Sequence, residues 1–146
     1  MIKISHRGNV KGPHKEYENN PIYVNESLQL GYDVEIDVWL IEGDLFLGHD
    51  IAEYKIDFNF LQNTSLWCHC KNIEALYFLL HNNIRCFFHD SDKATLTSDG
   101  YIWTYPGNKL TDRSICVMPE KDNWNLSKNI AGVCSDFVSD IEEYIK

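Results

Sequence analysis

The sequence has no apolar run that approaches the roughly 20 residues needed to cross a membrane. Its start, Met-Ile-Lys-Ile-Ser-His-Arg-Gly, enters a predicted strand at once and lacks the apolar segment of a signal peptide. Basic residues are also scarce, because 13 Lys and Arg stand against 22 Asp and Glu, which gives a formal net charge of −9. This balance argues against nucleic acid as a partner and disfavours anionic membrane surfaces. We therefore expect a protein with no membrane span.

Cysteines at a zinc-binding spacing are absent as well. The chain has five cysteines, an odd number, and they fall in apolar runs that resemble strands. The closest two, Cys68 and Cys70, are only two positions apart, whereas a zinc knuckle needs a wider paired spacing. We therefore predict that the cysteines are small buried hydrophobic residues in a reducing compartment, which indicates a cytoplasmic location.

The chain has 146 residues, of which 44% are hydrophobic, and this suits a single domain, residues 1–146, with a substantial core. Helices are predicted near residues 22–31, 73–80 and 138–145. Seven short, mostly apolar strands are predicted at residues 2–5, 33–40, 65–71, 84–88, 101–105, 114–118 and 131–135. Polar residues follow the carboxyl ends of these strands, which is typical of a parallel barrel with its active site at that end.

A full barrel of this kind takes about 250 residues, so this chain is short. Residues 89–100 and 106–113 are predicted as loops because they offer too little chain for helices. The expected fold class is therefore α/β, a trimmed (β/α) TIM-type barrel with reduced helices in its second half. Trimming leaves strand flanks uncovered, and we expect a homo-oligomer to cover them.

Residues 31–50 carry the densest set of chemically useful side chains. Glu35 and Asp37 alternate with apolar residues on a predicted strand, so both carboxylates lie on one face. Two neighbouring carboxylates repel each other and lose hydration if buried, and a hard divalent cation would relieve both costs. A short second strand then delivers His49. The alternative from these residues alone is an exposed strand with solvated acids.

Polar residues also gather at the ends of other predicted strands. Residues 4–50 contain, in order, the motifs His6-Arg7-Gly8, Glu18-Asn19, Gly31-Tyr-Asp-Val-Glu35-Ile-Asp37-Val, and Gly-Asp-Leu-Phe-Leu-Gly-His49-Asp50. The order and spacing of these motifs resemble those of the glycerophosphodiester phosphodiesterase family. Beyond residue 50 the match thins, although Cys-His69-Cys-Lys71 stands where the family has a Glu-x-Lys strand.

The resemblance implies a (β/α) barrel that cleaves a small-molecule phosphodiester with a divalent cation, usually Mg²⁺ or Ca²⁺. It implies that His6 and His49 form an acid–base pair and that Arg7 binds the phosphate. The remaining implied roles are metal binding by Glu35 and Asp37, and substrate binding by Lys71 and Glu18. The chemistry is consistent, because cations neutralise an anionic diester and imidazole transfers protons near neutral pH.

His69 departs from the family pattern, since it stands in place of a third metal carboxylate. As a ligand it would shift the preferred ion toward Mn²⁺ or Zn²⁺. Alternatively, His69 only hydrogen-bonds the substrate. Two other functions stay open: a catalytically inactive barrel that binds a phosphorylated headgroup, and a lyase that releases a cyclic phosphate.

Overall fold

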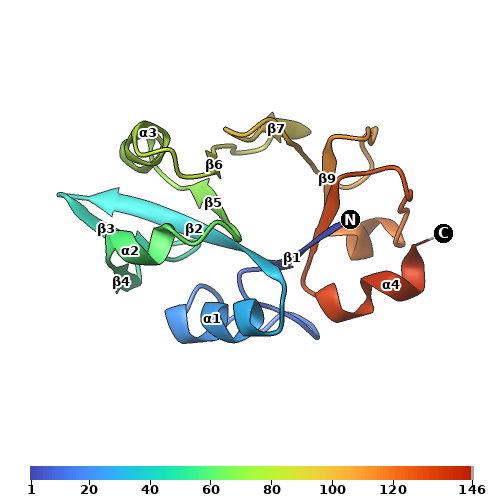
Figure 1. Ribbon diagram of the computed structural model, residues 1–146, viewed down its shortest axis with the longest axis horizontal. Coiled ribbons are helices and arrows are strands. Elements are labelled where there is room, and N and C mark those ends of the chain that lie inside the picture. The colour runs from blue at the N-terminus through green and yellow to red at the C-terminus, as the bar shows by residue number, and fades with distance from the viewer. Residues whose placement is uncertain (146) are drawn as a thin grey trace.

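The computed structural model describes residues 1–145, and one curled, mixed β-sheet dominates it (Figure 1). The strands are β1 (Ile2–His6), β2 (Asp33–Ile41), β3 (Asp44–Leu47), β4 (Tyr54–Ile56), β5 (Leu66–Cys70), β6 (Cys86–Phe87), β7 (Ala94–Leu96), β8 (Ile102–Thr104), β9 (Ser114–Val117) and β10 (Gly132–Ser135). The α-helices are α1 (Pro21–Gln29), α2 (Phe58–Leu61), α3 (Ile73–His81) and α4 (Ile141–Tyr144), and two 3₁₀ turns are η1 (Pro119–Asp122) and η2 (Val138–Asp140). No helix in these described residues has the length and apolarity to cross a membrane.

The central part of the sheet is parallel, in the order β6-β5-β2-β1-β10-β9-β8. β3 and β4 extend β2 as an antiparallel meander, and β7 pairs antiparallel with β8. The register places His6 beside Glu35 and Asp37 beside His69. Because the carboxyl ends of the parallel strands lie at one edge, the polar residues that follow them meet there.

The expected trimmed (β/α) TIM-type barrel is wrong. The sheet is a mixed, ten-stranded half-barrel, and residues 1–145 form only four short α-helices. Between β6 and α4 the chain forms no α-helix, and residues 89–100, predicted as a loop, contain β7. Connections this short cannot place a helix on the outside of each strand, so the second half closes with a hairpin instead of a helical layer.

The seven predicted strands are all present, and the short second strand predicted before His49 is β3. The predicted helices are also present, and Asn72 caps α3 through a bond from the Ala75 amide to its side chain, 3.0 Å. The cysteines of the described chain are buried and free, as predicted. Burial raises the pKa of the Cys116 thiol to about 11. The Cys116 thiol is therefore held in its neutral, unreactive form.

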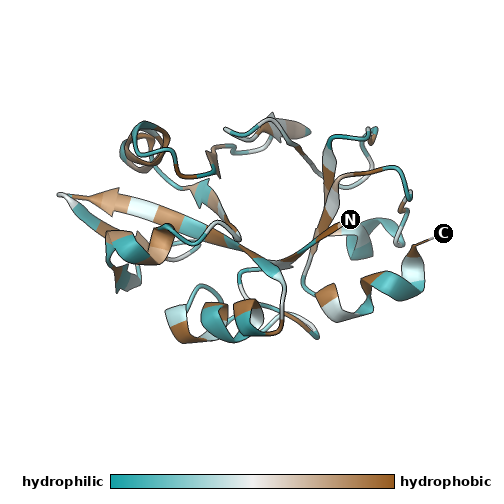
Figure 2. Ribbon diagram, in the orientation of Figure 1, coloured by the Kyte–Doolittle hydropathy of each residue, from teal (hydrophilic) through white to brown (hydrophobic). Residues whose placement is uncertain are grey.

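Apolar side chains pack on both faces of the sheet. Hydropathy alternates along β2 (Figure 2), and its apolar residues Val34, Ile36 and Val38 pack outward with α1 and α3. A second cluster that includes Trp67 and Phe87 lies on the other face of β5 and β6, the face that carries His69. The opposite face of β2 therefore places Glu35 and Asp37 on the inner, concave face of the sheet, the face that carries the cluster with Trp67 and Phe87.

Candidate active site

A cavity of about 500 Å³ opens at the carboxyl edge of the parallel strands. Six of the eight predicted site residues line it, namely His6, Arg7, Glu18, Glu35, His49 and His69. Asp37 is fully buried against this group, and Lys71 approaches Asp37 to 3.8 Å. The structure therefore brings together all eight residues that the sequence predicts for the site.

Asp37 is the residue around which the site is arranged, and its side chain is fully buried. Nitrogen atoms of five side chains surround its carboxylate: Asn19 Nδ2 at 2.9 Å, Arg7 Nε at 3.0 Å, His69 Nδ1 at 3.1 Å, His49 Nδ1 at 3.5 Å and Lys71 Nζ at 3.8 Å. Burial on its own raises the pKa of a carboxyl group. Here the close imidazole rings of His49 and His69, and the charge of Arg7, outweigh burial and hold the pKa of Asp37 well below its ordinary value.

Glu35 is also buried, but it has fewer partners. Its carboxylate lies 3.8 Å from His6 Nε2 and 3.9 Å from His69 Nδ1. Burial and the neighbouring charge of Asp37 raise the pKa of Glu35. Among the described residues, Glu35 Oε2 and Asp37 Oδ1 are buried and accept no hydrogen bond. A buried carboxylate oxygen without a donor is costly, so this pair has unused capacity for a cation.

The buried cluster of Glu35, Asp37 and His69 fits a metal ion. Each residue offers one ligand atom, and the three atoms lie within 4.8 Å of one another. Two carboxylate oxygens and one imidazole nitrogen are ordinary ligands for a divalent metal. The register between β2 and β5 produces this arrangement, because it sets Asp37 beside His69 on the inner face.

His6 forms a dyad with Asp136, a residue that directly follows β10. His6 Nδ1 lies 2.7 Å from Asp136 Oδ1, and Asn9 Nδ2 donates to the same oxygen over 2.8 Å. Burial alone would lower the pKa of His6, but the hydrogen bond to Asp136 and the charge of Glu35 raise it. The dyad therefore favours a protonated His6 and leaves Nε2 to face the cavity side, toward Glu35.

Arg7 connects the loop after β1 to the rest of the site. Its guanidinium contacts Glu18 Oε2 at 3.1 Å and His49 Nδ1 at 2.7 Å. The Arg7 backbone has φ +55°, a conformation that is uncommon for residues other than glycine. The next residue, Gly8, is packed so closely that a Cβ there would lie 2.7 Å from a ring carbon of Tyr23. Backbone strain of this kind is typical of functional sites, and the strained residue here contacts the carboxylates of Glu18 and Asp37.

Sequence reasoning did not assign roles to three residues that organise the site. Asp136 orients His6, Asn19 both donates to Asp37 Oδ2 and accepts from the Asp37 amide, and Asn9 bridges Glu18 to Asp136. Asp136 could have been found, because it follows a predicted strand just as the recognised residues do. Asn9 and Asn19 lie in a loop whose path no sequence period indicates.

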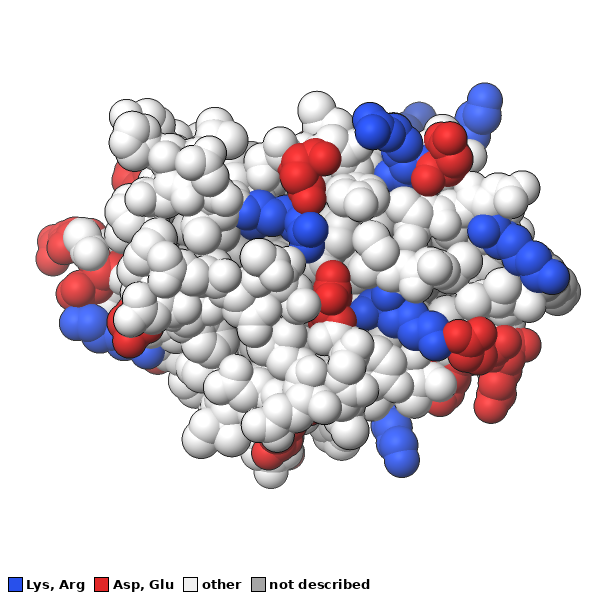
Figure 3. All heavy atoms as spheres, in the orientation of Figure 1, with Lys and Arg blue, Asp and Glu red and all other residues white. Residues whose placement is uncertain are grey.

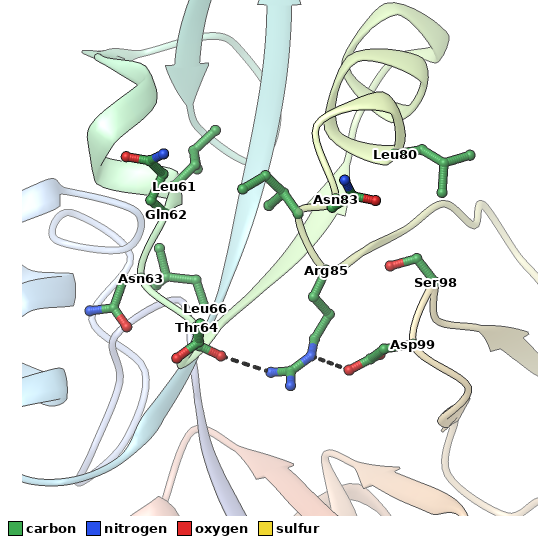
Figure 4. A pocket seen from close by; sticks show the side chains of 11 residues that line it. Leu61, Gln62, Asn63, Thr64, Leu66, Leu80, Asn83, Arg85, Ser98 and Asp99 are labelled. Carbon is green, nitrogen blue, oxygen red and sulfur yellow. Dashed lines mark hydrogen bonds and ion pairs between the residues drawn. The ribbon is translucent and has the colours of Figure 1, made fainter.

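A second cavity, of about 340 Å³, lies at the opposite end of the strands between α2 and α3 (Figure 4). Its one charged pair is already satisfied, since Arg85 donates to Asp99 Oδ2 at 2.6 Å and to the Thr64 carbonyl at 3.2 Å. Arg85 also lies over the Trp67 ring at 4.0 Å. Among the described residues, the metal-type cluster lies beside the first cavity and not here.

Comparisons of the chain with protein-family models, with curated proteins and with solved structures found no match.

Proposed function

We propose that this protein cleaves a small-molecule phosphodiester by metal-assisted acid–base catalysis, as its resemblance to glycerophosphodiester phosphodiesterases implies. The observation that supports the proposal best is the grouping of two histidines and an arginine over a buried cluster that fits a cation. The free, buried cysteines support a reducing, cytoplasmic setting.

Arg7 and Lys71 bind the phosphate in this proposal. Without substrate, Arg7 is held by Glu18, Asp37 and His49, and Lys71 lies near Asp37. An anionic diester competes for both cations, and planar guanidinium suits two phosphate oxygens at once. A divalent cation held by Glu35, Asp37 and His69 would supply further neutralisation of the charge that develops on the phosphate.

His6 is the general acid. Asp136 accepts from Nδ1 and supports the protonated ring, so Nε2–H is available to protonate a leaving alkoxide. His49 is the general base. Its Nδ1 faces a guanidinium nitrogen, which can only donate, so that ring nitrogen carries a lone pair. When Arg7 turns to the phosphate, this lone pair becomes free to take a proton from the attacking oxygen.

The variants His6→Ala and His49→Ala test the proposal, with His81→Ala at the exposed end of α3 as a matched control. We expect each site variant to abolish turnover of glycerophosphodiesters while thermal unfolding shows an intact fold, and we expect the control to keep normal turnover. Normal activity in either site variant would contradict the assignment. Phosphorus NMR of the products separates hydrolysis from release of a cyclic phosphate.

A second outcome would move the assignment to another class. If the wild-type chain shows no turnover with any divalent ion, but glycerol phosphates raise its unfolding temperature, the cavity binds a phosphorylated headgroup without cleaving it.

A further inference from the structure

The ring of His69 is held in one orientation by its neighbours. It stacks on Phe87 with 5.1 Å between ring centroids and an interplanar angle of 8°, and on His89 with 4.6 Å and 16°. The residue is only 8% exposed. A nearly buried side chain that stacks on two neighbouring rings is held in one orientation, so His69 acts from a fixed position.

The hydrogen bonding of His69 also fixes which nitrogen is available. Its Nε2 lies 3.3 Å from the backbone carbonyl oxygen of His89. A carbonyl only accepts, so Nε2 carries the hydrogen and, in the neutral ring, Nδ1 carries the lone pair. Nδ1 faces Asp37 Oδ1 at 3.1 Å and Glu35 Oε1 at 3.9 Å. Histidines that bind metals commonly donate their other nitrogen to a backbone carbonyl in this way.

The charge of the cluster is low for a hard cation. Only two carboxylates contribute to it, and Asp37 already faces Arg7 and Lys71. Mg²⁺ and Ca²⁺ prefer oxygen ligands and gain little from imidazole, whereas Mn²⁺, Co²⁺ and Zn²⁺ bind imidazole increasingly well. With one carboxylate fewer, the cluster binds a hard ion more weakly. The imidazole nitrogen restores affinity only for a softer ion.

We propose that the cluster of Glu35, Asp37 and His69 selects a first-row transition-metal ion over Mg²⁺ and Ca²⁺, and that His69 Nδ1 is the selecting ligand. This inference rests on the metal dependence in the proposed function and names the class of ion. The competing arrangement is a protonated His69 that pairs with Asp37 in place of a metal.

Metal binding to the full chain, measured by calorimetry after chelator treatment and without substrate, tests the inference. We expect Co²⁺ and Zn²⁺ to bind at least about tenfold more tightly than Mg²⁺ or Ca²⁺. Bound Co²⁺ should also give visible absorption bands. His69→Gln should lose at least about tenfold in Co²⁺ affinity. His69→Glu should reduce or reverse the preference for Co²⁺ over Mg²⁺, because it restores a carboxylate ligand. His14→Gln, at an exposed position, should bind like the wild type.

Equal wild-type affinity for Mg²⁺ and Co²⁺ would overturn the inference. Unchanged Co²⁺ affinity in a His69→Gln variant that unfolds as cooperatively as the wild type would also overturn it. Absence of binding by every ion would overturn it too and would favour the pairing of protonated His69 with Asp37. Because binding is read without substrate, selective Co²⁺ binding with no turnover would retain this inference and reject the proposed function. Turnover with Mg²⁺, together with no preference for Co²⁺ binding, would retain the proposed function and reject this inference.

Discussion

At the scale of single residues, the pKa values of two buried acids, Glu35 and Asp37, are shifted in opposite directions. Asp37 is held ionised by the donors around it, whereas burial and the nearby charge of Asp37 raise the pKa of Glu35. Neighbouring carboxylates whose pKa values are pushed apart are typical of catalytic and metal sites. A bound cation would favour ionisation of both carboxyl groups. The opposite pKa shifts of Glu35 and Asp37 therefore describe the site without a metal.

The Asp136→Asn variant isolates the charge behind His6 while preserving an oxygen that accepts from Nδ1. Because the hydrogen bond to Asp136 raises the pKa of His6, we expect the alkaline limb of the pH–rate profile to move to lower pH. Turnover at neutral pH should fall roughly tenfold, the effect of about one pKa unit on the protonated fraction. Asp112→Asn, at an exposed position, is the control, and an unshifted profile in Asp136→Asn would count against the dyad.

The same dyad predicts a pH dependence of stability. The folded state raises the pKa of His6 above 6.5, so its contribution is complete below pH 6.5 and is lost as pH rises through the folded-state pKa. The pKa of Asp136 lies below 3.8 in the folded state, so its contribution is complete above pH 3.8 and is lost as pH falls through that lower value. Both contributions are present together between these limits.

Urea unfolding of wild type and His6→Gln, with chelator present, checks this window. We expect the loss in free energy of unfolding to be larger at pH 5 than at pH 9, because the charged dyad is complete only at the lower pH. A difference between the two proteins that does not change with pH would show that His6 contributes packing alone.

At the scale of elements, the turn after β3 determines where His49 lies. Gly48 has φ +153°, and a Cβ there would overlap the carbonyl oxygen of Ile51. The Gly48 amide donates to the Asp37 carbonyl at 3.1 Å, and its own carbonyl accepts from Trp39 Nε1 at 2.7 Å. The glycine therefore ties the turn to β2 and places His49 beside Arg7.

Gly48→Ala should disrupt this turn, and Gly43→Ala in the preceding hairpin is its matched control. Both positions have positive φ, which costs about 1 kcal/mol with alanine, but a Cβ at Gly43 has no atom within 4 Å. We expect Gly48→Ala to lose at least about 1 kcal/mol more than Gly43→Ala and to lose turnover. Urea unfolding and turnover measure the two effects, and equal behaviour of the variants would contradict this description of the turn.

The sequence predicted the elements with strong periodicity or an apolar run and missed those with neither. β2 alternates over nine residues, and α3 has helical spacing with an Asn72 cap, so both were predictable. β6 and β8 are as short as β4 and β7 but lie within apolar runs, so they were predicted. β4 and β7 have three residues each, lie in mostly polar stretches, and were missed. The barrel was predicted from strand count and polar strand ends, but the short connections and antiparallel pairings that make it a half-barrel depend on tertiary contacts.

The candidate site was more predictable than the fold around it. His6, Glu35, Asp37 and His69 belong to strands, so their inward direction follows from alternation and register. Partners such as Asn19 come from loops, and their positions depend on backbone turns that a pattern of residue types does not encode.

At the scale of the whole molecule, the half-barrel leaves apolar surface uncovered. On α3, Ile73, Tyr77 and Leu80 are 65%, 70% and 56% exposed, and their spacing places them along one side of the helix. In the view of Figure 3, the surface over α2 and α3 carries few charged side chains. Leu96 on the edge strand β7 is exposed as well. Exposed apolar stripes and free strand edges are features that association often covers.

We therefore retain the prediction of a homo-oligomer. Sedimentation velocity at micromolar concentration should show a species larger than the 17.0 kDa chain. The Tyr77→Lys variant should shift the distribution toward monomer without loss of fold, because a charge would have to be desolvated in the covered face. A clean wild-type monomer would contradict the prediction.

The most direct test of the proposed function is turnover of glycerophosphodiesters and bis(p-nitrophenyl) phosphate by the metal-stripped chain, with each divalent ion restored in turn. We expect no turnover in chelator, recovery on addition of an ion that the Glu35–Asp37–His69 cluster binds, and no recovery in His6→Ala. Turnover that persists in chelator, or that survives in His6→Ala, would contradict metal-assisted acid–base cleavage at this site.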